Sequence, residues 1–311
     1  MKGLEIARDF FFSWGRPFLT AQFSHLAGRV AAGRIRGSDV LSGDDEISHD
    51  HDWGPQFDLF LLADDYAAFG EQLSRAMNSA APNPWKGYRL AGAGDKSVQV
   101  ESVPGWFRKY LKFERFPLAA ADWPPSSVES GLYFLRHGEI WIDGTGEMGR
   151  WRSALHEYPD EILRSRLAEE CFRIWQHGEY NFIQRMARRR DPIAIAVCLG
   201  EFVTGVMRIV LLMSRDFTPY WKWLAFEFRK RSEARPYVTM LEELVSIRLI
   251  ERQVEIVQSV CAMVHQQLID GGWVAGTGGN PHLLPLLNDK LELESPDRDR
   301  RHMRGMPKGM E

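Results

Sequence analysis

Strand-like sequence is confined to the first half of this 311-residue chain, and helix-like sequence fills the second half. Short apolar or alternating segments typical of buried strands occur at 57–62, 96–103 and 139–143. Helical patterns occur among them at 64–80 and 126–136. Short strands mixed with helices in this way predict an α+β domain with a mixed sheet over residues 1–155.

After residue 155 the periodicity is that of helices alone. Amphipathic runs occur at 159–189, 192–214, 219–232 and 236–270. We therefore expect an all-helical bundle over residues 156–296. The charged segment 297–311 is expected to form a flexible tail. Asp191-Pro192 marks the clearest helix start, because an aspartate cap precedes proline at the first helical position.

Two short helices are predicted at the amino end of the chain, over 3–14 and 17–28. Gly15, Arg16 and Pro17 lie between them, and proline opens a helix more readily than it continues one. These helices lead into a turn-rich segment that begins at Val30.

The overall charge excludes one class of partner. Lys and Arg total 39 against 42 Asp and Glu, so the net charge is −3 and no global basic field is present to hold nucleic acid. Glu5 and Asp9 interrupt the apolar pattern at the amino end, where a secretion signal would be basic and then apolar. A cytoplasmic protein is expected.

The segment 193–213 is apolar enough to suggest a membrane span. Glu201 and Arg208 interrupt it, so we interpret it as a central helix of the bundle and expect no membrane partner. The three cysteines lie far apart without metal-ligand spacing and are expected to be buried thiols. They are Cys171, Cys198 and Cys261.

The main chemical signal lies between Gly37 and Asp52. Eleven residues separate Ser38 from Asp50. If the segment around Asp50 is an extended strand, Asp50 and Asp52 project to one face, and His49, His51 and Trp53 project to the other. Two carboxylates on one face repel each other unless a hard cation such as Mg²⁺ neutralises them. Gly37 allows close approach of backbone to a phosphate, and Ser38 supplies a hydroxyl and an amide as donors.

A third carboxylate would complete a site for one or two magnesium ions. Glu101 is the candidate, because it alternates outward on a strand-like segment, where it is suited to bind metal or to deprotonate an acceptor. A solvated strand residue is the alternative interpretation. Asp58 and Asp143 also lie in strand-like segments and compete for the same role.

Gly-Ser followed by Asp-x-Asp resembles the signature of the polymerase beta-like nucleotidyltransferases, which include kanamycin nucleotidyltransferase and small antitoxin-type nucleotidyltransferases. The motif sequences are most similar to those of a bacterial family of predicted nucleotidyltransferases, whose domain is named only as a domain of unknown function. The matching segments are 37–38, 44–48, 50–55 and 220–223, and the similarity extends from about residue 5 to about residue 270. It implies metal binding by Asp50 and Asp52 and acceptor activation by Glu101.

The helical half offers further candidates for binding a nucleotide. Arg185, Arg188 and Arg189 share one helix face and are suited to grip a triphosphate, although a solvated basic face is the favoured interpretation of the spacing. Tyr220 and Lys222 combine an aromatic platform with a cation, or else form a packed aromatic cluster.

Glu201, Gly205 and Arg208 form a polar stripe on an apolar helix. Because buried charges need partners, ion pairing within the bundle is favoured over a role in binding the acceptor.

The sequence thus predicts an enzyme that transfers a nucleoside monophosphate, with ATP or another nucleoside triphosphate as donor. AMP from ATP is the expected group. The acceptor is expected to be a hydroxyl of a small molecule or protein, and pyrophosphate the product. One alternative is a noncatalytic nucleotide- or partner-binding module of antitoxin type. Another is a phosphohydrolase that uses His49, Asp50, His51 and Asp52 as a metal cluster, although strand alternation separates the histidines from the aspartates.

Overall fold

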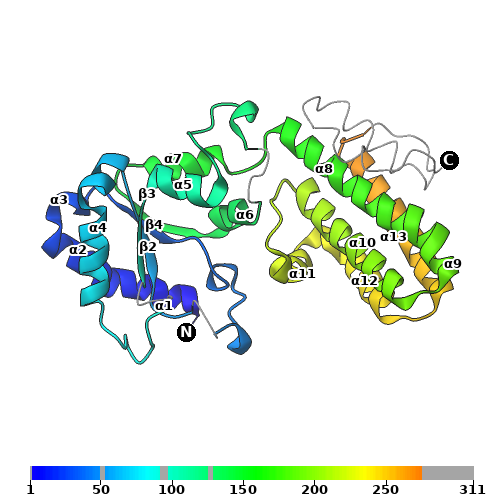
Figure 1. Cartoon of the computed structure of the whole chain (residues 1–311), viewed down its shortest axis with the longest axis horizontal. Coiled ribbons are helices and arrows are strands. Elements are labelled where there is room, and N and C mark those ends of the chain that lie inside the picture. Colours follow the sequence, from blue (N-terminus) through cyan, green and yellow to red (C-terminus); the bar gives the residue numbers. More distant parts are fainter. Residues whose placement is uncertain (1, 50–52, 92–96, 125–128, 275–311) are drawn as a thin grey trace. The chain divides into compact units, whose positions relative to one another are not determined.

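The computed structural model describes residues 2–49, 53–91, 97–124 and 129–274 (Figure 1). The chain divides into two compact units, Met1–Glu157 (unit 1) and Tyr158–Glu311 (unit 2). The sequence patterns predict that the mixed α+β domain ends at residue 155 and that the helical bundle begins at residue 156. The tail proposed for 297–311 lies outside the described residues.

Unit 1 is built on a four-stranded sheet with the order β3-β2-β1-β4. The strands are β1 (Ala31–Arg34), β2 (Phe57–Leu61), β3 (Val98–Ser102) and β4 (Glu139–Asp143). β1 pairs antiparallel with both β2 and β4, whereas β2 and β3 run parallel. This mixed sheet, followed by a helical unit, confirms the predicted α+β class.

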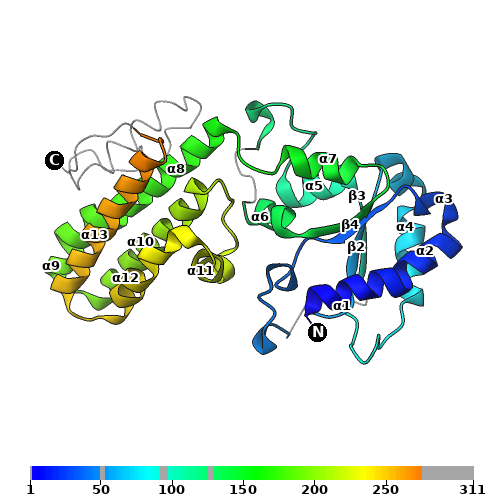
Figure 2. The same cartoon turned by 180° about the vertical axis from the view of Figure 1, so that it is seen from behind.

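Helices cover both faces of the sheet (Figures 1 and 2). The helices of unit 1 are α1 (Gly3–Phe10), α2 (Arg16–Gln22), α3 (Ser24–Ala27), α4 (Ala63–Ala80), α5 (Val103–Leu111), α6 (Glu129–His137) and α7 (Glu147–Ala154). On one face, Phe57, Leu59 and Val98 pack with residues of α1, α2 and α4. On the other face, Phe60 packs edge-on against Trp106 of α5 with the ring centroids 6.1 Å apart.

The predicted break between the two amino-terminal helices is absent. A π-helical turn, Phe11–Gly15, joins α1 to α2, and Gly15 keeps helical dihedrals. The wider π turn accommodates Pro17, which has no amide hydrogen to donate. The helix ends at Phe23 instead, where the backbone leaves the helical region.

β1 is the strand that the sequence patterns do not reveal. Its four residues, Ala-Ala-Gly-Arg, include no β-branched or aromatic side chain. The neighbouring strand makes the glycine necessary, because a Cβ on Gly33 would lie 2.2 Å from the carbonyl oxygen of Glu139. Close backbone packing, rather than propensity, therefore determines β1.

Unit 2 is helical throughout its described residues. Its helices are α8 (Asp160–Ile174), α9 (Ala187–Arg189), α10 (Pro192–Met213), α11 (Trp221–Arg229), α12 (Arg235–Ser246) and α13 (Ile250–Asp270). A π-helix, Trp175–Met186, joins α8 to α9 without a break. The predicted start of α10 is confirmed, because the Asp191 carboxylate accepts hydrogen bonds from the amides of Ile193 (2.9 Å) and Ala194 (3.2 Å).

The single helical run expected over 236–270 is two helices. Ile247 is extended and lies between α12 and α13. The Gln253 side chain donates to the carbonyls of Leu244 (3.2 Å) and Ile247 (2.9 Å), so the carbonyls at the break have partners. Neither glycine nor proline marks the break, which explains why the sequence pattern missed it.

Among the described residues, α10 alone is long and apolar enough to cross a membrane. Half of its most apolar window is buried within the protein, and Glu201 and Arg208 form ion pairs with α8. These contacts are typical of a core helix. The three cysteines are buried and free, as predicted.

Candidate functional site

The turn that carries Gly37 and Ser38 follows directly after β1. Gly37 has φ +117°, and a Cβ there would lie 2.5 Å from the Arg34 guanidinium and 2.3 Å from the Asp39 carboxylate. Arg34 donates to Asp39 through two nitrogens, at 3.0 and 3.3 Å, and both side chains are buried. This bidentate pair fixes the turn, and glycine is required for the chain to wrap around it.

Ser38 initiates a short 3-10 helix, Asp39–Leu41. Its carbonyl accepts hydrogen bonds from the amides of Leu41 (3.2 Å) and Gly43 (3.0 Å). Its side chain is half-buried. Glycine and serine therefore lie on a tight, pinned turn at the carboxyl end of β1, as a phosphate-binding turn requires.

Asp58 of β2 is a second buried carboxylate, opposite Gly33 on the strand that leads into this turn. It pairs with Gly33 on β1 and with Gln99 on β3, and only 2% of its surface is exposed. Within the described part of the chain, its Oδ2 atom has no hydrogen-bond partner. Burial raises the pKa of Asp58, although Arg34, Arg36 and the Ile35 amide oppose the shift.

Arg36, immediately before Gly37, is a cation that lies near Asp58. Its Nη2 atom lies 4.0 Å from Asp58 Oδ1. Its guanidinium stacks on the Tyr110 ring of α5, 4.0 Å from the ring centroid. Its buried Nε atom has no hydrogen-bond partner among the described residues. The sequence reasoning missed Arg36; the available signal was an arginine directly before Gly-Ser.

Glu101 lies on β3, on the same face of the sheet as Asp58. It is opposite Phe60, two residues along β2 from Asp58. Its carboxylate accepts a hydrogen bond from Lys109 Nζ at 2.5 Å, and this contact raises the pKa of Lys109. Glu101 is therefore farther than Asp58 from the Gly37-Ser38 turn, and a cation from α5 already binds it.

Asp50 and Asp52 lie outside the described residues. The expected strand alternation around them does not extend to either side, because Glu46–His49 forms a 3-10 helix and Trp53 precedes β2 without belonging to it. The phosphohydrolase alternative rested on His49, His51 and the same two aspartates, and most of that cluster also falls outside the described residues.

The residues that flank 50–52 are anchored to α1. The Asp44 carboxylate accepts hydrogen bonds from the Gly3 amide (2.6 Å) and from the Trp53 indole (3.4 Å). Gly54 has φ +126°, and a Cβ there would lie 2.7 Å from the Arg89 carbonyl oxygen. The Asp-Asp-Glu-Ile-Ser and Trp-Gly-Pro segments thus have structural roles on both sides of the two aspartates.

Asp143, another competitor for the third carboxylate, has a structural contact at the end of β4. Its Oδ2 atom accepts a hydrogen bond from the Gly149 amide in the first turn of α7, at 2.7 Å. This contact satisfies a free amide at a helix start. Among the described residues, no three histidine, cysteine, aspartate or glutamate side chains are grouped closely enough to hold a metal.

The candidate ligands of unit 2 are arranged differently from the sequence prediction. The Arg185 side chain folds back on Tyr180, stacks on its ring at 3.8 Å and donates to its hydroxyl at 2.6 Å. Arg188 and Arg189 are exposed in α9. Tyr220 is half exposed, and Lys222 is exposed with its ammonium 5.1 Å from the Trp223 ring centroid.

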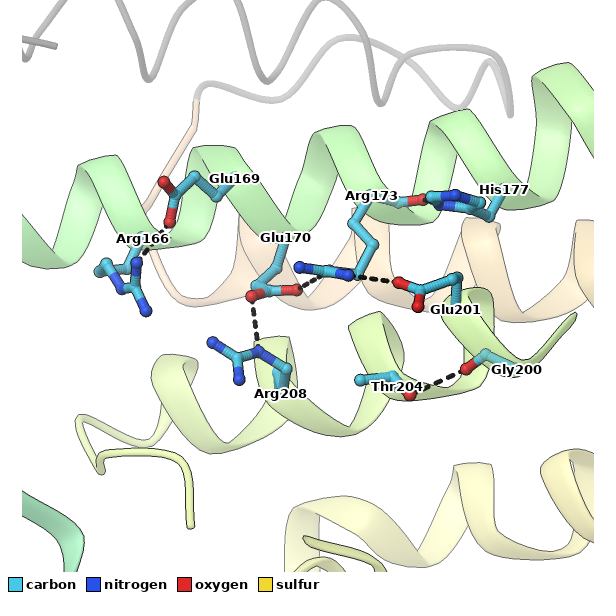
Figure 3. Close-up of polar contacts among 9 residues, drawn as sticks. All are labelled: Arg166, Glu169, Glu170, Arg173, His177, Gly200, Glu201, Thr204 and Arg208. Atoms are coloured by element: carbon cyan, nitrogen blue, oxygen red, sulfur yellow. Dashed lines mark hydrogen bonds and ion pairs between the residues drawn. The ribbon is translucent and has the colours of Figure 1, made fainter. Parts of the chain in front are cut away.

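The polar stripe of α10 faces α8 (Figure 3). Arg208 Nε donates to the buried Glu170 carboxylate at 2.6 Å, and Glu170 also accepts from Arg173 at 2.9 Å. Arg173 in turn pairs with Glu201. A Cβ on Gly205 would lie 3.0 Å from Ile174, so this glycine lets the two helices approach closely. These contacts support the structural interpretation of the stripe.

Comparison with known proteins adds a partial match. A family model described as a domain of unknown function (DUF4037) matches residues 126–224. This region includes 220–223 but excludes the Gly37-Ser38 turn and the two aspartates. No curated protein matches the chain. The chain is also similar to the crystal structure of a nucleotidyltransferase-like protein from Exiguobacterium sibiricum 255-15, with 10% identity and a TM-score of 0.41 over 93% of this chain and 91% of that one.

Proposed function

We propose that the chain is a metal-dependent nucleotidyltransferase whose chemistry takes place in unit 1. It transfers a nucleoside monophosphate, AMP from ATP, to a hydroxyl of a small molecule or protein and releases pyrophosphate. The observation that carries this proposal is Asp58. It is a buried carboxylate with an oxygen that has no hydrogen-bond partner among the described residues, and it lies opposite Gly33 on β1, the strand that leads into the Gly37-Ser38 turn.

The donor atoms suit magnesium. The Asp58 Oδ2 atom is a hard oxygen donor for which the described part of the chain provides no hydrogen-bond partner. The motif resemblance assigns Asp50 and Asp52 to the same metal, and the proposal keeps that assignment. When bound, the metal would neutralise charge on the triphosphate and activate the attacking hydroxyl. This geometry favours Asp58 over Glu101 as the third metal carboxylate.

The turn would hold the triphosphate. Gly37 leaves the backbone open to a phosphate, and Ser38 supplies a hydroxyl and an amide as donors. Catalysis of phosphoryl transfer depends mainly on positioning and on neutralising charge. In this proposal Glu101 is the base for the acceptor hydroxyl, and Lys109 positions it.

The unit 2 residues that the sequence predicts as nucleotide or acceptor ligands differ in their exposure. Lys222 and Tyr220 are the better candidates, since both are exposed at the start of α11. Arg188 is exposed in the same way, whereas Arg185 must leave Tyr180 to reach a phosphate.

The noncatalytic alternative also has an observation in its favour. Lys109 already neutralises Glu101, and a carboxylate paired in this way is a poor base until the pair opens. A module that binds a nucleotide without turnover would keep such a pair closed.

Pyrophosphate release separates the two functions. The purified protein would be incubated with Mg²⁺ and each nucleoside triphosphate, together with pooled hydroxyl-bearing small molecules and proteins. We expect release with one nucleotide, and a decrease of at least about 100-fold in the Asp50→Asn and Asp52→Asn variants. Nucleotide binding without release would favour the noncatalytic module. Equal release by the variants would show a contaminant.

A further inference from the structure

Arg36 and Asp58 form an ion pair without a hydrogen bond between them. The shortest distance between their charged atoms is 4.0 Å, beyond hydrogen-bond range. Each side chain also has a buried polar atom without a partner among the described residues, Nε of Arg36 and Oδ2 of Asp58. A buried polar atom without a hydrogen-bond partner destabilises the folded state. The pair therefore resembles a binding site more than a structural contact.

A closed pair in the same turn provides the comparison. Arg34 lies two residues before Arg36, and Asp39 directly follows Ser38. Arg34 donates two hydrogen bonds to Asp39, at 3.0 and 3.3 Å. The fold thus builds a bidentate arginine–carboxylate pair where it stabilises the turn. The different geometry at Arg36 and Asp58 is a local property of those two side chains.

Tyr110 holds the Arg36 guanidinium in place. The ring lies under the guanidinium at 4.0 Å and packs against Trp106 with the centroids 5.3 Å apart. A stacked ring fixes the plane of a guanidinium but leaves the hydrogen atoms at its edge available to an acceptor. Arg36 is therefore positioned and still able to donate.

The two unpartnered atoms require opposite partners. Nε of Arg36 needs an acceptor oxygen, whereas Oδ2 of Asp58 needs a donor or a cation. A divalent cation bound to a phosphate supplies both at once. We propose, on the basis of the proposed function, that Arg36 is a triphosphate-binding residue. In the free protein Arg36 neutralises Asp58 in part, and it exchanges this carboxylate for a phosphate when the metal–nucleotide complex binds.

This exchange predicts opposite effects on metal and nucleotide. In the free protein Arg36 competes with a cation for Asp58, so its removal should strengthen binding of the metal alone. In the complex Arg36 contacts phosphate, so its removal should weaken binding of the nucleotide. A residue that only supports the turn would weaken both.

The test measures both affinities without relying on catalysis. Free Mn²⁺ would be followed by electron paramagnetic resonance, with and without a non-hydrolysable ATP analogue, in the full-length protein. For Arg36→Gln we expect about threefold to tenfold tighter binding of Mn²⁺ alone, and about tenfold to 100-fold weaker binding of the analogue with Mn²⁺. Arg108→Gln is the matched control, because Arg108 is an exposed arginine of α5 paired with Glu114.

A second variant protects the test against misfolding. Arg36→Lys keeps the charge but loses the planar edge, so it should bind Mn²⁺ alone as the wild type does and bind the analogue less tightly. Weaker Mn²⁺ binding by Arg36→Gln, or loss of analogue affinity no larger than in Arg108→Gln, overturns the exchange. If the wild type binds no Mn²⁺–analogue complex, the proposed function fails together with it.

Discussion

In the proposed site, Asp58 is a residue whose burial lowers the stability of the fold. Its carboxylate is buried between neighbours that neutralise it only in part, and its pKa is raised by burial. When the pKa of a carboxylate is higher in the folded state than in the unfolded state, the protein loses stability as pH rises from the unfolded-state pKa to the folded-state pKa. The loss persists at every higher pH. The proposed metal-binding role, rather than packing, would account for such a residue in an apolar strand.

We therefore expect Asp58→Asn to unfold at an equal or higher temperature than the wild type at pH 7, while Mn²⁺ binding is lost. This gain in stability should vanish below about pH 4, where Asp58 of the wild type is protonated and is neutral like the asparagine of the variant. Thermal unfolding of both proteins between about pH 3 and pH 8 measures the gain. A midpoint several degrees lower at pH 7 would show that Asp58 is a structural residue.

Asp44 provides the contrasting control. Burial opposes its ionisation, but hydrogen bonds from the Gly3 amide and the Trp53 indole outweigh burial and leave the pKa lowered. A carboxylate whose pKa is lowered in the folded state stabilises the protein at pH values above the unfolded-state pKa. This stabilisation is lost as pH falls through the folded-state pKa. Asp44→Asn should therefore lower stability at pH 7, by about 1–3 kcal/mol.

Glu179 gives unit 2 a dependence on pH. Burial raises its pKa to about 7 from an ordinary value of 4.5, so the folded protein holds an extra proton between these values. The free energy of unfolding should fall by roughly 3 kcal/mol as pH rises across this window, and Glu179→Gln should remove the slope. Urea unfolding followed by hydrogen exchange of peptides from unit 2 would measure it. The same slope in Glu179→Gln would assign it to another group.

Single residues were predictable where local chemistry determines them. Asp191 followed by proline specifies a helix cap whatever surrounds it. Glu201 and Arg208 could be expected to need partners, but Glu170 could not be identified, because it belongs to another helix. Arg36 was missed for a similar reason. Its significance depends on Asp58 and Tyr110, which only the fold brings near it.

At the scale of elements, the contact between α8 and α10 depends on one buried glutamate. Glu170 is paired with Arg173 and Arg208, whose side chains are 36% and 21% exposed. Removing one partner of a buried pair leaves unpaired charge, which costs about 3–5 kcal/mol. Because both arginines retain access to water, the lower end of this range applies.

Glu170→Ala should therefore destabilise unit 2 by about 3 kcal/mol. Glu169→Ala is the matched control, since Glu169 is the adjacent glutamate and its pair with Arg166 is more exposed; its loss should cost at most about 1 kcal/mol. Chemical denaturation of both variants measures the difference. Equal losses would show that the polar stripe does not hold the two helices together.

Helices and strands with a strong hydrophobic periodicity were predicted from sequence. Those that depend on packing against neighbouring segments of the protein were not. β2, β3, β4 and α4 match their predicted ranges closely. β1 lacks strand-forming side chains and depends on close packing against β4. The π turn at Phe11–Gly15 replaced a predicted break, since the sequence shows the proline but not the wider turn that accommodates it.

At the scale of the whole molecule, the change from mixed to purely helical periodicity was sufficient to predict an α+β unit followed by a helical one. Each unit has its own buried core, so the local patterns carry the information. The function does not follow from architecture in this way. Asp50 and Asp52 remain predictions from sequence, and the described part of the site contributes Asp58, Arg36 and the Gly37-Ser38 turn.

The central claim is that unit 1 binds a nucleotide through a divalent metal, and calorimetry tests it most directly. ATP, GTP, CTP and UTP would be titrated into the whole protein with and without Mg²⁺, alongside the Asp50→Asn/Asp52→Asn double variant. We expect one nucleotide to bind only with Mg²⁺, and the double variant to bind it at least about tenfold more weakly. Absence of binding by a well-folded wild type, or equal binding by the variant, would contradict the claim.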